Sequence, residues 1–128
     1  FKSMDEVLAE SDVIGVHVQL TADTTHLIGA EQFAKMKRNS IFLNGARGAV
    51  ADTHALVDAL NSGHLMGAGI DVFEEEPTPS DHPLFACEHV VLTPHCADMT
   101  PEGVDLLNEG AVDNVLAYLD GHPQNRVA

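Results

Sequence analysis

The stretch Ile41–Ile70 reads IFLNGARGAVADTHALVDALNSGHLMGAGI and decides the fold of this chain. Ile41-Phe42-Leu43 is a short apolar run and Leu65 to Ile70 is another, which is typical of buried strands. Between them, Asp52 is a good N-cap residue and Gly63 a good stop for a helix. The apolar residues of that helix share one face: Ala55, Leu56, Ala59 and Leu60. A strand, a helix and a strand in this order predict a βαβ unit with parallel strands.

The same alternation continues on both sides of this unit. Ser3 and Glu6 fit a capping box, and Thr100-Pro101 is a good pair for the first turn of a long helix. Helices are predicted at residues 3–10, 31–37 and 100–119, and further strands at 13–18 and 90–92. Strands that alternate with amphipathic helices predict an α/β fold, a doubly wound parallel sheet covered on both faces.

Length and charge narrow the classes of partner. The chain has 128 residues, with 6 Lys and Arg against 20 Asp and Glu, and a formal net charge of −14. This length suits one domain, since domains cluster near about 100–150 residues. The shortage of basic residues argues against a nucleic-acid partner, because Lys and Arg supply most of the affinity for phosphate backbones. The longest apolar runs are far shorter than the ~20 residues of a membrane helix, so no membrane partner is expected.

The two cysteines, Cys87 and Cys96, do not make a disulfide framework, and the start of the chain has no signal-like pattern. We therefore expect free thiols and a cytoplasmic protein, while a single disulfide between the two stays open. Three histidines lie near the cysteines in the sequence: His82, His89 and His95. Their spacing fits no closed Cys/His zinc site, so no metal is expected.

Three side chains with complementary chemistry follow three different predicted strands. Because ligands bind beyond the carboxyl ends of parallel strands, Arg47, Glu76 and His95 are expected to converge at one edge of the sheet. Arg47 can hold a carboxylate by two parallel hydrogen bonds, and His95 can exchange a proton near neutral pH. A nearby Glu76 carboxylate would stabilise the imidazolium and hold one tautomer. The set predicts an anionic substrate with an oxygen that gains or loses a proton. Glu74 and Glu75 are interpreted as solvated loop charges.

Three motifs follow one another along the chain: Asn44-Gly45-Ala46-Arg47-Gly48, then Gly69-Ile70-Asp71-Val72-Phe73 with Glu76-Pro77, then Thr93-Pro94-His95. In this order they resemble the D-isomer-specific 2-hydroxyacid dehydrogenases, and the resemblance covers nearly the whole chain. It implies a Rossmann-like fold, NAD as cofactor with NADP not excluded, and a small 2-hydroxy or 2-oxo acid as substrate. It also implies a homodimer.

The resemblance assigns roles to individual residues. It implies that Arg47 binds the carboxylate and carbonyl of the substrate, that His95 donates or accepts the proton, and that Glu76 is the partner of His95. The resemblance also implies that the hydride passes between C2 of the substrate and the nicotinamide of the cofactor. The residues implied in cofactor binding are Val18, Thr24, Gly45, Ala46, Arg47, Asp71 and His95. The family often has His-x-Pro after the first of these strands, where this chain has His17-Val18-Gln19.

A part of the expected nucleotide site is absent from the sequence. A Rossmann domain holds pyrophosphate with a G-x-G-x-x-G loop, followed about 20 residues later by an acid for the adenosine ribose. Gly67-Ala68-Gly69 does not qualify, because Val72 follows and no helix is predicted there. We interpret residues 1–128 as the second half of an NAD(P)-binding domain, with a helix at 100–120 leading toward a missing substrate domain. A non-catalytic binding protein like the C-terminal-binding-protein corepressors, or a remnant on the same scaffold, stays open as an alternative.

Overall fold

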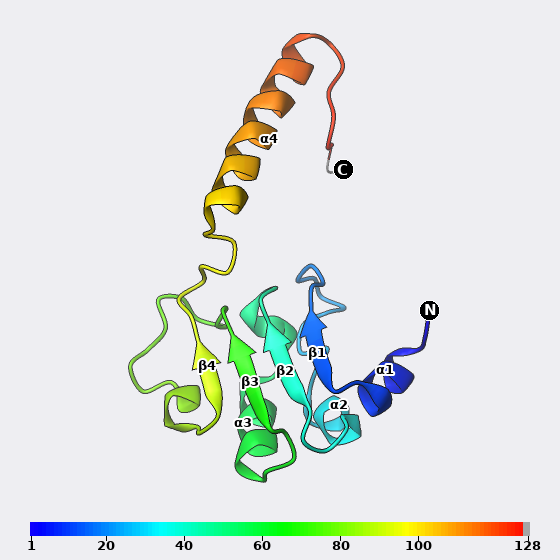
Figure 1. The fold of residues 1–128 in the computed structure, drawn as a ribbon, viewed down its shortest axis with the longest axis vertical. Helices are drawn as coiled ribbons and strands as arrows, with labels where there is room; N and C mark the ends of the chain where they lie inside the picture. The colour runs from blue at the N-terminus through cyan, green and yellow to red at the C-terminus, as the bar shows by residue number, and fades with distance from the viewer. Residues whose placement is uncertain (127–128) are drawn as a thin grey trace. The chain divides into compact units, whose positions relative to one another are not determined.

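The computed structural model describes residues 1–126, and the chain divides into two units (Figure 1). Unit 1 is Phe1–His95, and unit 2 begins at Cys96. The elements of unit 1 are α1 (Met4–Glu10), β1 (Val13–Val16), α2 (Ala30–Lys35), β2 (Ile41–Asn44), the 3₁₀ turn η1 (Gly48–Val50), α3 (Thr53–Asn61), β3 (Gly67–Ile70), the 3₁₀ turn η2 (Pro83–Ala86) and β4 (Val90–Leu92). Unit 2 contains the long helix α4 (Pro101–Leu119).

The strands form one parallel sheet in the order β1-β2-β3-β4. The register aligns their last residues, because Val16 pairs with Asn44, Asn44 with Ile70, and Ile70 with Leu92. The carboxyl ends of the strands therefore lie level at one edge of the sheet, where the arrowheads meet in Figure 1. The predicted α/β fold with a parallel sheet is confirmed.

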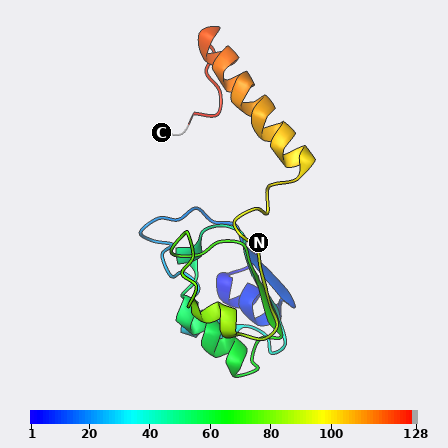
Figure 2. The ribbon, with the colours of Figure 1, turned by 90° about the vertical axis from the view of Figure 1, so that its left-hand side faces the viewer.

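The hydrophobic core lies between one face of this sheet and the helices of unit 1. Figure 2 shows α1 and α3 on the same side of the sheet, and α2 packs against both of them. The strand residues that point to this side are buried: Ile14, Val16, Phe42, Ala68 and Ile70. Phe33 of α2 meets the fully buried Phe42 edge-on, with ring centroids 5.1 Å apart. This aromatic pair fixes α2 against the middle of the sheet.

The opposite face of the sheet differs from the prediction of helices on both sides. Val13, Leu43 and Val91 point to it and are 52%, 41% and 69% exposed. The cause is the strand order: each connection moves one strand further in the same direction, and right-handed crossovers then place every connecting helix on the same side. A sheet is wound on both faces only where the strand order reverses, and the described residues of unit 1 contain no reversal.

Most helix boundaries follow the predicted caps. The Ser3 and Glu6 capping box is present, and the Asp52 carboxylate accepts a hydrogen bond of 3.0 Å from the Ala55 amide at the start of α3. Strands β1 and β3 are shorter than predicted, since residues 17–18 and 65–66 lie outside them. The amide of Leu65 bonds to the carbonyl of Ala59, so this residue forms the turn out of α3 rather than the start of a strand.

Helix α4 begins after Thr100 as predicted, and the Thr100 hydroxyl accepts a 3.0 Å hydrogen bond from the Gly103 amide. Its apolar side chains are exposed, among them Leu106, Leu107 and Tyr118. Helix α2 spans residues 30–35 rather than 31–37. None of the helices in residues 1–126 combines the length and the apolar character that crossing a bilayer requires.

The one-sided core can be tested by two substitutions on opposite faces of the sheet. We expect Phe42→Ala to lower the free energy of unfolding by about 3–5 kcal/mol, because it opens a cavity beside Phe33. The control Val91→Ala lies on the exposed face and should cost less than about 1 kcal/mol. Urea denaturation of the 128-residue chain measures both values, and equal losses would contradict a core on one face.

Candidate active site

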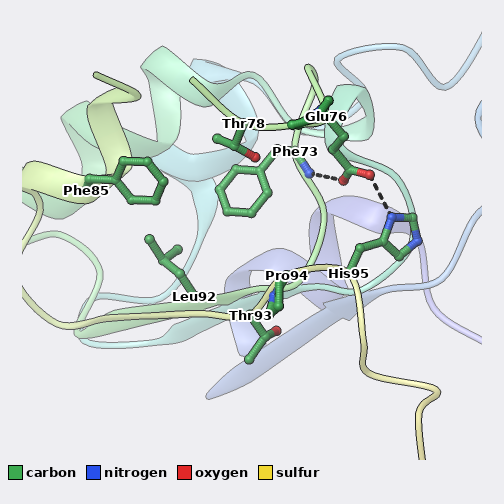
Figure 3. Close-up of a pocket in the computed structure, with 9 residues that line it drawn as sticks. Phe73, Glu76, Thr78, Phe85, Leu92, Thr93, Pro94 and His95 are labelled. Carbon is green, nitrogen blue, oxygen red and sulfur yellow. Dashed lines mark hydrogen bonds and ion pairs between the residues drawn. The ribbon is translucent and has the colours of Figure 1, made fainter. Parts of the chain in front are cut away.

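The structure brings Glu76 and His95 into direct contact at the carboxyl edge of the sheet (Figure 3). Glu76 lies in the loop after β3, and His95 follows β4. The Nδ1 atom of His95 lies 2.7 Å from Oε2 of Glu76, while Oε1 of Glu76 accepts a 2.8 Å hydrogen bond from the Phe73 amide. The pKa of Glu76 is held below its ordinary value by the hydrogen bond from His95, then by the Phe73 amide and the charge of Arg47. Glu76 is therefore a carboxylate at neutral pH and an acceptor for the His95 ring.

Hydrogen bonds also fix the backbone of His95. Its φ angle of 55° lies in the left-handed region, which costs a residue other than glycine about 1–3 kcal/mol. The amide of His95 donates to the Asp71 carbonyl over 2.8 Å, and the hydroxyl of Thr93 donates to the Asp71 carboxylate over 2.5 Å. These bonds join the end of β4 to the end of β3 and offset the cost of the turn.

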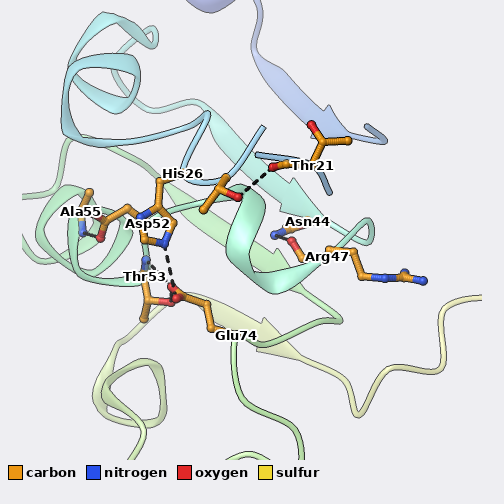
Figure 4. A network of polar contacts seen from close by, with 9 residues as sticks. Thr21, His26, Asn44, Arg47, Asp52, Thr53, Ala55 and Glu74 are labelled. Carbon is orange, nitrogen blue, oxygen red and sulfur yellow. Dashed lines mark hydrogen bonds and ion pairs between the residues drawn. The ribbon is translucent and has the colours of Figure 1, made fainter. Parts of the chain in front are cut away.

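Arg47 is placed by the turn that follows β2, and Figure 4 shows its side chain extending away from η1. Asn44 is buried and uses both ends of its amide on this turn: Nδ2 donates to the Arg47 carbonyl and Oδ1 accepts from the Ala46 amide, each over 3.1 Å. The exposed guanidinium of Arg47 donates to the Ala46 carbonyl over 2.7 Å. Sequence reasoning missed the role of Asn44, although Asn before Gly at a strand end is a signal for such a side-chain turn.

The loop with Arg47 and the loop with Glu76 are in backbone contact. A Cβ atom on Gly48 would lie 2.0 Å from the Phe73 carbonyl carbon and 2.3 Å from the Glu74 nitrogen. Only glycine permits this approach, because no real Cβ contact is so short. The position of the arginine turn therefore limits where the glutamate loop can run.

A polar hollow of about 590 Å³ lies beyond the ends of β1 and β2. Its lining includes four of the residues predicted to bind cofactor: Val18, Gly45, Ala46 and Arg47. Thr24 lies elsewhere, because its hydroxyl donates to the Gln19 carbonyl and accepts from the Thr21 amide, each over 2.7 Å. Thr24 thus stabilises the loop that forms one wall of the hollow. The assignment of these residues to a cofactor stays a prediction.

A second, apolar pocket of about 400 Å³ lies beside the Glu76–His95 pair. Its walls include Phe73, Phe85 and Leu92, and the ring nitrogen of His95 that does not face Glu76 points away from them (Figure 3). The pocket therefore lies on the side of the pair opposite to this ring nitrogen. Asp71 and His95, the other two residues predicted to bind cofactor, are outside the lining of the polar hollow. Within residues 1–126, no three His, Cys, Asp or Glu side chains are grouped so as to hold a metal ion.

The parallel sheet defines a Rossmann-like α/β fold, and such folds bind ligands at the carboxyl edge, where the Glu76–His95 pair and Arg47 lie. The family model for "D-isomer specific 2-hydroxyacid dehydrogenase, NAD binding domain" matches residues 1–97. The chain belongs to this family, as its motifs predicted.

Known relatives show how much of such a protein the chain spans. It is 46% identical over 121 residues to glyoxylate reductase of Thermofilum pendens, covering 94% of this chain and 36% of that protein. It is 48% identical over 118 residues to glyoxylate/hydroxypyruvate reductase B of Cronobacter sakazakii, covering 92% and 36%. The crystal structure of D-lactate dehydrogenase with NAD+ from Lactobacillus jensenii matches with a TM-score of 0.86 at 33% identity, covering 99% of this chain and 42% of that one. The chain thus spans little more than a third of the length of these curated relatives.

The contact at Gly48 predicts that two glycines of one motif differ in how much stability the protein loses when each is replaced by alanine. We expect Gly48→Ala to lower the free energy of unfolding by about 1–3 kcal/mol, because the added Cβ must push the backbone of Phe73 away. Gly45→Ala is the matched control, since its Cβ would meet open space. Urea denaturation compares the variants with the parent chain. A Gly48→Ala variant as stable as Gly45→Ala would show that the two loops do not touch.

Proposed function

We propose that the protein to which this chain belongs is an oxidoreductase that interconverts a small 2-hydroxy acid and its 2-oxo acid with NAD or NADP. The observation that carries the proposal is the 2.7 Å contact between His95 and Glu76, with Arg47 at the end of the neighbouring strand β2. The matching relatives bear the names of reductases, which favours an enzyme over a non-catalytic binding protein on the same scaffold.

The proposed roles follow from the chemistry of each side chain. Arg47 is permanently charged and can hold the substrate carboxylate by two parallel hydrogen bonds, which fixes the orientation of the adjacent carbonyl or hydroxyl. With Nδ1 of His95 donating to Glu76, the other ring nitrogen is directed away from the apolar pocket and can exchange a proton with the substrate oxygen. The negative charge of Glu76 stabilises the imidazolium that gives up this proton during reduction.

The polar hollow at the ends of β1 and β2 fits the nicotinamide end of a dinucleotide. A bound nicotinamide cofactor would supply the hydride transfer. The backbone at Val18 and from Gly45 to Arg47 would form its wall, Thr24 would hold the wall in place, and Asp71 would lie near the carboxamide. Related solved structures carry NAD+ in one case and NADPH in another, so both cofactors remain part of the proposal.

Small substrates, a cytoplasmic location and a homodimer complete the proposal. Relatives are named for glyoxylate and hydroxypyruvate, both small 2-oxo acids. The cytoplasmic location is supported by the cysteine content, because two cysteines in 128 residues make no disulfide framework. The exposed apolar side chains of α4, among them Leu107 and Leu116, support a surface that is covered by a partner.

The role of His95 is tested by removing its ring. In the complete protein, His95→Ala should lower kcat for reduction of glyoxylate or hydroxypyruvate by about 10²–10⁴-fold, because the proton no longer has a positioned donor. His122→Ala changes an exposed histidine of the C-terminal segment and should leave kcat unchanged. The oxidation of NADH or NADPH followed by absorbance measures both variants. Unchanged turnover in His95→Ala would refute the proposed role.

The cofactor proposal also predicts what this chain does by itself. The 128-residue chain should bind NADH weakly or not at all, because its sequence has no G-x-G-x-x-G loop to hold the pyrophosphate. The complete protein should bind it with ordinary cofactor affinity. Isothermal titration calorimetry distinguishes the cases, and micromolar binding by the 128-residue chain would contradict the prediction.

A further inference from the structure

Glu74 makes contacts that set it apart from the solvated charge expected from the sequence. Its Oε1 atom accepts hydrogen bonds from the hydroxyl of Thr53 at 2.9 Å and from the amide of Thr53 at 3.4 Å. Its Oε2 atom lies 3.4 Å from Nε2 of His26 (Figure 4). Glu74 and Glu75 are both exposed, so it is these contacts rather than burial that distinguish Glu74.

The partners of Glu74 belong to parts of the fold that are themselves fixed. Thr53 is the first residue of α3, directly after the Asp52 cap, and the helix is anchored by the buried Leu56. The amide of His26 donates to the carbonyl of Ala49 over 2.7 Å, just beyond the arginine turn. Glu74 therefore joins the loop after β3 to a helix start and to the segment that carries Arg47.

Only one residue separates Glu74 from Glu76, so the position of one limits the position of the other. On one side, the backbone of Phe73 and Glu74 packs so closely against Gly48 that a Cβ atom there would clash with it. On the other, Glu76 must reach His95 across 2.7 Å while it accepts from the Phe73 amide. A loop that shifts by about 1 Å loses such a contact, and misplacements of this size can cost about 10²-fold in rate.

We propose that Glu74 is a positioning residue: its bonds to Thr53 and His26 hold the loop after β3 so that Glu76 meets His95. This inference rests on the proposed function for its effect on turnover, but the contact it describes is independent of that function. Glu74 acts through Glu76 and has no contact with the reacting groups of its own.

The test compares substitutions at Glu74 with the same substitution at Glu75 in the complete protein. Glu74→Ala should lower kcat by about tenfold to a hundredfold, with the KM for the cofactor changed less than about twofold. Glu75→Ala is the matched control and should leave both constants unchanged, since it removes an equal charge from the same loop. Glu74→Gln keeps the acceptor for Thr53 and should restore most of kcat, which also separates the effect from misfolding.

A second substitution tests the partner. Thr53→Val should lower kcat in the same direction, and adding it to Glu74→Ala should lower kcat no further, because both changes break one connection. Additive losses in the double variant, or equal losses in Glu74→Ala and Glu75→Ala, would overturn the proposal.

A direct view of the contact separates this proposal from the proposed function. NMR of the protein with isotope-labelled histidine, with the His95 signal identified by its loss in His95→Asn, reports whether Nδ1 is hydrogen-bonded. The signal should change in Glu74→Ala and stay the same in Glu75→Ala. If the parent protein reduces no 2-oxo acid but the signal still changes, the function fails and the positioning role stands. If the parent is active and Glu74→Ala changes neither turnover nor signal, the positioning role fails alone.

Discussion

The register of the parallel strands, which aligns their last residues, is the constraint on which the rest of the structure depends. Val16, Asn44, Ile70 and Leu92 are aligned across the sheet. Every loop that leaves a strand therefore starts from the same edge, and residues far apart in the sequence meet there. Glu76 and His95 are in contact for this reason, although neither belongs to a strand. A shift of one residue in the pairing of β4 would turn Leu92 to the exposed face and move His95 away from Glu76.

Glycine and buried polar side chains convert this alignment into a defined geometry. Gly48 lets the arginine turn touch the backbone of the glutamate loop, and Asn44 closes the same turn with two hydrogen bonds. Asp71 accepts from Thr93 and, through its carbonyl, from the amide of His95. The site is thus built from contacts between loops, each anchored by a neighbouring strand end, rather than from one rigid element.

Apolar periodicity and cap residues predict the parts of this fold that depend on local chemistry. The sheet, the Asp52 cap and the long α4 are examples, because a few adjacent residues determine each. The convergence of Glu76 and His95 was predictable too, since parallel topology alone places the ends of β3 and β4 together. The open face of the sheet was not, because Val13 and Val91 are apolar and nothing in their sequence shows that the strand order does not reverse within residues 1–126. The contacts of Glu74 were equally hidden: they join residues 21 and 48 positions apart, and only the folded backbone brings those residues together.

Arg47 forms no salt bridge in the part of the chain that the structure describes, although the chain is rich in carboxylates. With 20 acidic residues against 6 basic ones, carboxylates are plentiful; the three lysines form salt bridges, while Arg38, Arg47 and Arg126 form none among the described residues. Lys2 pairs with Glu10, Lys35 with Asp5 and Glu31, and Lys37 with Asp12. Arg47 instead donates to the carbonyl of Ala46 and forms no salt bridge within residues 1–126, while Glu76, the acid whose pKa it helps to lower, is already engaged by His95. In the proposed function, the pairing of Glu76 with His95 would have a second effect: it would engage the carboxylate that could otherwise compete with the substrate for the Arg47 guanidinium.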